Sequence, residues 1–175
     1  MLRFGLEKRS EGIDGRRDLD IALAFIAGGL FEDACRLLEA GAAAHEEFRS
    51  SLLFLFNHAM ADWGRRGTPS LERFELIRKR YRLAEDDVSS TRLDANFDQC
   101  MAVTFAVLGD KEDARSHLSE ALRRIRKYLS SFSCWTYLSA DKSAFERHCA
   151  LIGTLIDDPS VVPLFISENR PSLKH

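Results

Sequence analysis

The sequence predicts an all-α fold, and three observations support this prediction. Only four prolines and ten glycines interrupt the 175 residues, and the segments between them are rich in the helix formers Ala, Leu, Arg and Glu. Apolar residues recur in these segments at the spacing of one helix face. The β-branched or aromatic runs, such as Val161-Val162 and Val103-Thr104-Phe105, are too short or too helically patterned to build a sheet.

The composition is that of a globular domain, with 45% hydrophobic and 30% charged residues. A net charge of -2 gives no overall attraction to nucleic acids or anionic membranes. The longest apolar run, around Leu52 to Phe56, is far too short for a membrane span, so we expect no membrane association. Four widely spaced cysteines without a CxxC pair indicate reduced core thiols and a cytoplasmic location. These cysteines are Cys35, Cys100, Cys134 and Cys149.

We expect residues 1–17, which are charged and carry three glycines, to form a flexible or irregular lead-in. From Asp18 the apolar residues predict a first helix, and Gly28-Gly29 should end it with a turn. A second helix is then predicted to begin near Phe31.

The next two predicted helices are joined by glycine and proline. The segment Glu46 to Trp63 has a wide apolar face, so we expect it to be central, and Gly64, Gly67 and Pro69 should close it. A further helix is predicted over residues 71–83.

The second half of the chain is predicted to start with a polar linker over residues 85–91 and a helix over residues 93–108. Gly109-Asp110 should end this helix, and Asp110 is placed to cap the next one, which extends to about Lys127. Residues 128–138 either continue that helix or form a separate aromatic segment.

The last predicted helix begins at Asp141 or Ser143, ends at Ile156 before Pro159, and is followed by a short helix near Val162. Residues 169–175 should be a frayed tail. Residues 18–168 are therefore predicted to form a single domain.

The most informative pattern is an internal repeat about 80 residues apart. Glu32-Asp33-Ala34 matches Glu112-Asp113-Ala114, and each alanine follows a glycine at the same distance. The other matching pairs are Ala22 with Ala102, Phe25 with Phe105, Leu38 with Leu118, and Gly41 with Ala121. Small residues let two helices approach closely, the phenylalanine fills the space between them, and glycine permits the tight reversal. Each unit therefore predicts an antiparallel helical hairpin.

These residue types, in this order, resemble the tetratricopeptide repeat. The resemblance covers the two matching units, with residues 46–83 as a degenerate middle hairpin, and it departs from the family pattern at Asp98, where the family carries an apolar residue. It implies a short α-solenoid of antiparallel hairpins, which the final helices would cap. An ordinary non-repeat helical bundle of other function is the alternative fold.

The resemblance also implies a protein-protein interaction module, an adaptor or scaffold that binds a partner protein or peptide. In that family the ligand commonly lies along the groove lined by the first helix of each hairpin. Carried over to this sequence, the groove residues are Arg16, Leu19, Leu23 and Ile26 in one unit, and Asn96, Gln99, Val103 and Ala106 in the other.

Catalytic and metal sites receive no support from the sequence. No histidine lies in a metal-binding motif, and His58 and Asp62, one helical turn apart, supply only two ligands. His148 and Cys149 are adjacent on a helix, so their side chains diverge and do not form a catalytic pair. We therefore predict that the chain is not an enzyme and that it requires no cofactor.

Two alternatives remain for the partner. Two arginine-rich helical segments, Arg78 to Arg82 and Arg123 to Lys127, would track a phosphate backbone if they lay side by side. Interspersed acidic residues and the preference of helix ends for basic residues disfavour this nucleic-acid hypothesis. Exposure of the phenylalanines in the 52–56 segment would indicate a homo-oligomer, although we expect them to be buried.

Overall fold

The computed structural model describes residues 17–49, 51–85, 95–127 and 142–161. Within these ranges all regular elements are helices, which confirms the predicted all-α class. A helix over residues 17–27 comes first. The later elements, with η for a short 3₁₀ helix, are α2 (Phe31–Ala44), η1 (Glu46–Arg49), α3 (Leu52–Arg66), α4 (Leu71–Glu85), α5 (Ala95–Val107), α6 (Lys111–Lys127), α7 (Lys142–Asp157) and η3 (Pro159–Val161).

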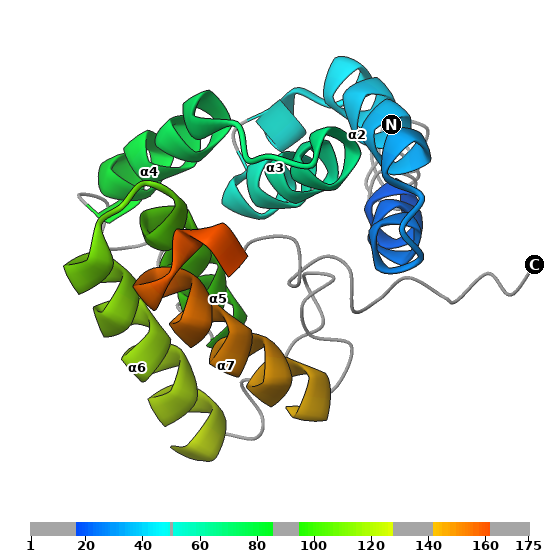
Figure 1. Cartoon of the computed structure of the whole chain (residues 1–175). Coiled ribbons are helices and arrows are strands. Elements are labelled where there is room, and N and C mark those ends of the chain that lie inside the picture. Colours follow the sequence, from blue (N-terminus) through cyan, green and yellow to red (C-terminus); the bar gives the residue numbers. More distant parts are fainter. Residues whose placement is uncertain (1–16, 50, 86–94, 128–141, 162–175) are drawn as a thin grey trace, which may run out of the picture.

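Helices that follow one another along the chain pack against one another (Figure 1). Contacts join α2 to α3, α3 to α4, α4 to α5, and α5 to α6, while α7 packs on both α5 and α6. A large buried cluster takes side chains from the 17–27 helix, from α2 to α6 and from α7. A smaller one, between α5, α6 and α7, contains Ala95, Ala121, Ile125, Phe145 and Cys149.

The most enclosed helix is α5, not the segment 46–63 that we expected to be central. Every side chain from Ala95 to Ala106 is buried except that of Phe97. A helix covered on all sides needs no polar face, which explains why its sequence lacks the amphipathic pattern of a surface helix. The wide apolar face predicted for the earlier segment is present, because Phe54, Phe56 and Trp63 of α3 are buried.

Gly28-Gly29 ends the first helix as predicted, in a Schellman turn. The backbone N–H of Leu30 donates to Phe25 O at 2.8 Å, and that of Gly29 donates to Ile26 O at 3.1 Å. Gly29 has φ 75°, the left-handed conformation that this turn requires and that glycine adopts without steric cost.

The turn between α5 and α6 has the same hydrogen bonds. Asp110 N–H donates to Phe105 O at 2.9 Å, Gly109 N–H donates to Ala106 O at 3.1 Å, and Gly109 has φ 80°. The matching alanines are all inaccessible to solvent, at 0% exposure: Ala22, Ala34, Ala102 and Ala114. The two units of the internal repeat therefore turn in the same way and bury the same small residues.

Asp110 caps α6, as the sequence predicts. The backbone N–H of Asp113 lies 3.4 Å from Asp110 Oδ1. The corresponding residue in the first hairpin, Leu30, has no side-chain acceptor and leaves α2 without such a cap. The two units of the repeat thus share the backbone turn but not the capping side chain.

Gly109→Ala should cost roughly 1 kcal/mol of folding free energy, through backbone strain alone. A methyl group added at Gly109 would meet no other atom within 4 Å, so no steric clash adds to this cost. Gly67→Ala should cost about the same, because Gly67 has φ 77° and equally open surroundings. Urea denaturation of both variants tests this prediction. Gly28→Ala, beside the first turn but without a positive φ, is the control and should be nearly neutral.

The predicted helix over residues 46–63 is wrong in two respects. It is divided into η1 and α3 at Ser51, whose backbone is extended and whose Oγ accepts a hydrogen bond from Phe54 N at 3.4 Å. In addition, Gly64 does not close the helix but lies inside α3, where an added Cβ would overlap the ring of Phe31. The helix ends at Gly67, whose N–H donates to Trp63 O.

The predicted last helix agrees with α7, and η3 lies beside the short helix expected near Val162. The lead-in up to residue 16, the undecided segment 128–138 and the tail 169–175 lie outside the described residues. No described helix has both the length and the apolar character needed to cross a membrane.

Candidate functional site

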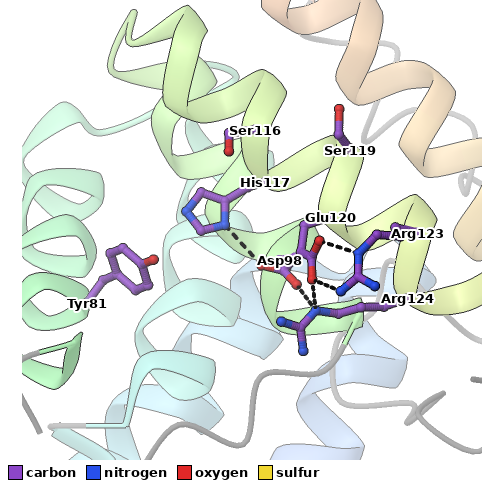
Figure 2. A pocket seen from close by; sticks show the side chains of 8 residues that line it. All are labelled: Tyr81, Asp98, Ser116, His117, Ser119, Glu120, Arg123 and Arg124. Carbon is purple, nitrogen blue, oxygen red and sulfur yellow. Dashed lines mark hydrogen bonds and ion pairs between the residues drawn. The ribbon is translucent and has the colours of Figure 1, made fainter. Parts of the chain in front are cut away.

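A pocket of about 490 Å³ opens where α4, α5 and α6 meet. Its walls expose polar and apolar surface in nearly equal amounts, and most of them come from one face of α6. The lining residues are Tyr81 of α4, Asp98 of α5, and Ser116, His117, Ser119, Glu120, Arg123 and Arg124 of α6 (Figure 2).

The inner wall of the pocket is the carboxylate of Asp98, whose side chain is only 3% exposed. His117 Nδ1 lies 3.0 Å from Asp98 Oδ1, and because a carboxylate only accepts hydrogen bonds, Nδ1 carries the proton. Arg124 Nε lies 2.9 Å from Oδ2 as an ion pair, although its angle is not that of a hydrogen bond. Two residues of α6 therefore compensate one buried charge of α5.

The outer wall is a carboxylate between two guanidinium groups. Arg123 Nε donates to Glu120 Oε2 at 2.7 Å, and Arg124 Nε donates to Glu120 Oε1 at 2.8 Å. The hydrogen bond from Arg123 is the main cause that lowers the pKa of Glu120 to about 2. Glu120 is therefore ionised at neutral pH, and it orients both arginines at the rim, as Figure 2 shows.

Aromatic rings form the base of the pocket and join α4 to α6. The imidazole of His117 stacks on Phe105, with centroids 5.5 Å apart and planes 8° apart. Tyr81 meets the same imidazole edge-on at 5.4 Å, and it also contacts Phe97 and Phe105. Such contacts contribute about 0.5–1.5 kcal/mol each beyond their buried area, so His117 is held on two sides.

The chemistry that this arrangement offers is polar binding. Its hydroxyl, carboxylate and guanidinium groups provide both donors and acceptors of hydrogen bonds. The Asp98–His117 pair has the form of an oriented base. Within the described residues, however, no hydroxyl group is hydrogen-bonded to His117, so nothing there marks a nucleophile. That the chain is not an enzyme stays a prediction.

A second polar cluster surrounds Asp62, which is 1% exposed. Arg65 donates to Asp62 Oδ1 at 2.6 Å, and Arg73 of α4 donates to Oδ2 at 3.2 Å. Arg66 lies 3.5 Å from the same carboxylate. Burial alone would raise the pKa of Asp62, but the hydrogen bond from Arg65 and the charge of Arg73 outweigh it, and the pKa is lowered. This cluster ties α4 to α3.

His58 belongs to the Asp62 cluster, and its side chain is only 12% exposed. Arg73 Nη1 lies 3.2 Å from His58 Nδ1, and since arginine only donates, Nδ1 is the acceptor and the imidazole is neutral. His58 Nε2 lies 3.6 Å from Glu39 Oε1 of α2. Burial, and next the charge of Arg73, lower the pKa of His58.

The stability of the fold should therefore decrease as the pH falls below 6.5, the ordinary pKa of histidine. The unfolded chain takes up a proton at His58 in this range, whereas the folded chain resists protonation until its lower pKa is reached, so acid favours unfolding. One such group changes the free energy of unfolding by at most about 1.4 kcal/mol per pH unit. Urea denaturation between pH 7.5 and 5 measures the slope. A His58→Gln variant with an unchanged slope would contradict the assignment.

The described cysteines and the adjacent His148 and Cys149 are held in buried positions. Cys35, Cys100 and Cys149 are buried free thiols, and burial raises the pKa of Cys35 to about 11 and that of Cys149 to about 12. Cys134 lies outside the described residues. His148 Nδ1 contacts Ala144 O at 2.7 Å, whereas Cys149 Sγ contacts Gln99. Among the described residues, no three potential ligands lie together as a metal site would require.

The predicted groove residues do not form one open surface. Leu19 and Leu23 are half-buried, Ile26 is buried, and Arg16 lies outside the described residues. The four predicted positions on α5 are all buried: Asn96, Gln99, Val103 and Ala106. Gln99 Nε2 lies 3.4 Å from Phe145 O, so a partner would reach this amide only if α7 moved away.

Of the residues that line the pocket, the sequence singles out Asp98, Arg123 and Arg124, but it does not indicate that they meet in one site. Four polar residues, Asn96, Asp98, Gln99 and Thr104, interrupt an otherwise apolar helix, and a buried charge must have partners. Asp98 departs from the repeat pattern, but its partners lie 19 and 26 residues further along, on α6. Their positions depend on how α5 and α6 pack.

Comparison with known proteins adds no family. No family model, curated protein or solved structure matches this chain.

Proposed function

We propose that this chain is a protein-protein interaction module, an adaptor or scaffold, built from hairpins like those of tetratricopeptide repeats. The observation that carries the proposal is the second Schellman turn. Gly109 repeats the hydrogen bonds and the positive φ of Gly29, and the same alanines are buried on either side of both turns. Repeated hairpins whose neighbours stack in chain order are typical of solenoids, which bind other chains on their surfaces. In this proposal α7 is the capping helix.

The pocket between α4, α5 and α6 is the proposed contact point for a partner segment. Buried ion pairs fix its inner wall, while the hydroxyl groups of Ser116 and Ser119 and the guanidinium of Arg123 lie at its rim. A preformed polar surface binds without a large loss of conformational entropy. It suits a peptide segment that offers both polar groups and apolar carbon to the pocket.

Site-specific photo-cross-linking tests this proposal. A photoreactive residue is placed at Ser119, at the pocket rim, and the chain is irradiated in an extract of its native cells. We expect a discrete cross-linked protein, and expect it to be lost when Arg123 is changed to Glu. The control carries the photoreactive residue at Thr154, an exposed position of α7 outside the pocket. Identical products from both positions, or no product from Ser119, would reject the pocket as the contact site.

Binding of nucleic acid is the second candidate, favoured by the contact between Tyr81 and His117, which brings the two basic helices α4 and α6 together. Ion pairs weaken this candidate, because Arg78 is bound to Glu75 and Arg123 to Glu120. A salt titration with generic DNA and RNA distinguishes the two functions. Binding that falls steeply with salt, with log K against log salt giving a slope of several units, would favour the nucleic-acid candidate.

A further inference from the structure

The outer face of α4 carries four exposed residues in one line: Leu76, Lys79, Arg80 and Leu83, here called the α4 stripe. Their spacing of three and four residues places them on a single helix face. The residues of α4 that enter the core, Phe74, Ile77 and Tyr81, lie on the opposite face. The stripe therefore contributes nothing to the packing of the described core.

The leucines of the stripe are two of the most exposed large apolar residues, at 42% for Leu76 and 57% for Leu83. They are separated by seven residues, a rise of about 10.5 Å along the helix. Between them, Lys79 and Arg80 have no carboxylate partner among the described residues, although the adjacent Arg78 is paired with Glu75. Two apolar contacts thus flank an uncompensated positive charge.

We propose that the α4 stripe binds an acidic amphipathic helix of a partner protein, an inference that rests on the interaction function proposed above and names its partner class. Apolar residues of the partner, seven positions apart, would cover Leu76 and Leu83. Its Glu or Asp residues between them would pair with Lys79 and Arg80. Exposed leucines gain from burial, and the charge pairs select the sign and register of the partner helix.

A second copy of this chain fits the stripe poorly. Two α4 helices could pair in an antiparallel way, in the register that buries both leucines of each copy. In that register, Lys79 of each copy lies opposite Arg80 of the other copy. Like charges at such an interface are destabilising. A shifted register pairs Glu72 with Arg80 of the other copy but leaves Leu83 uncovered. The partner that satisfies all four residues is an acidic helix.

An anionic membrane also fits less well. Helices that lie on membranes have a broad apolar face with basic residues on the polar face. In the α4 stripe the two cations lie between the leucines, on the same narrow line. This arrangement matches alternating apolar and acidic side chains of a helix better than a lipid surface.

Fluorescence anisotropy with two synthetic helical peptides of about 20 residues, long enough to form helix, tests the proposal. Both peptides carry Leu at seven-residue spacing, and the residues between are Glu in one and Lys in the other. We expect the Glu peptide to bind the full chain and the Lys peptide not to bind. The Lys79→Glu/Arg80→Glu variant should bind the Glu peptide at least about tenfold more weakly than the wild type. The same variant should bind the Lys peptide. Such an exchange of preference does not arise from unfolding.

The Leu76→Glu/Leu83→Glu variant should also lose its affinity for the Glu peptide. The control is Leu30→Glu, which changes a leucine outside α4 that is 51% exposed. This control should bind the Glu peptide as the wild type does. The proposal is overturned if neither peptide binds, or if charge reversal changes nothing. It is also overturned if the stripe instead mediates self-association in sedimentation or binding to phosphatidylserine vesicles. Because cross-linking from Ser119 depends on the pocket and not on the stripe, its outcome distinguishes failure here from failure of the proposed function.

Discussion

Replacing Phe105 by alanine is expected to destabilise the fold by about 3–5 kcal/mol, the range for truncation of a buried phenylalanine. Its side chain is 2% exposed, stacks on the imidazole of His117 and meets the ring of Tyr81 edge-on. The change would leave a cavity at the junction of α4, α5 and α6, and it would remove the support of the pocket. Urea denaturation monitored by circular dichroism gives the free energy of unfolding.

The control for this experiment is the corresponding phenylalanine of the first hairpin. Phe25 is only half-buried, so Phe25→Ala should cost about 1–2 kcal/mol. Phe105→Leu should retain most of the stability, because it keeps the apolar volume and loses only the ring stacking. Equal losses of unfolding free energy for Phe25→Ala and Phe105→Ala would contradict the difference in burial between the two phenylalanines.

Asp62→Ala is expected to cost about 2–3 kcal/mol, below the range of about 3–5 for removal of one partner from a fully buried pair. The carboxylate is buried, but the guanidinium groups of Arg65, Arg66 and Arg73 are each about one-third exposed or more and regain water when it is removed. Thermal or urea unfolding at pH 7 measures this loss.

An exposed carboxylate provides the matched control. Asp33→Ala removes a surface pair with Arg36 and should change stability by less than about 1 kcal/mol. The lowered pKa of Asp62 adds a pH test, because its stabilisation is present above the ordinary value of 3.8 and is lost as the pH falls through the folded value. The difference between wild type and Asp62→Ala should therefore shrink in acid. A difference that persists there would point to packing as its cause.

Local chemistry made the two hairpin turns predictable. A glycine in the left-handed conformation, a preceding phenylalanine and a small residue five positions later are all close together in the sequence, and both turns form as expected at Gly29 and Gly109. The cap at Asp110 was predictable for the same reason. The helix break at Ser51 was missed because the apolar pattern continues through it.

The candidate site could not be predicted in this way. Asp98 is recognisable as an unusual residue in an apolar helix, but its partners His117 and Arg124 come from α6. Which of the arginines on α6 turns toward α5 depends on the rotation of that helix in the packed structure. The four predicted groove positions on α5 are buried for a related reason. Sequence periodicity does not distinguish a helix face that lines a groove from a face that another helix covers.

The fit between Phe31 and Gly64 has a consequence for the comparison of sequences. The ring of Phe31 occupies the volume that any side chain at residue 64 would need, so residue 64 is not free to change alone. We expect homologous chains to exchange the two in concert, with a larger residue at 64 only where residue 31 has become small. Such covariation between two positions in separate helices would identify relatives of this fold even after the glycine turns had diverged.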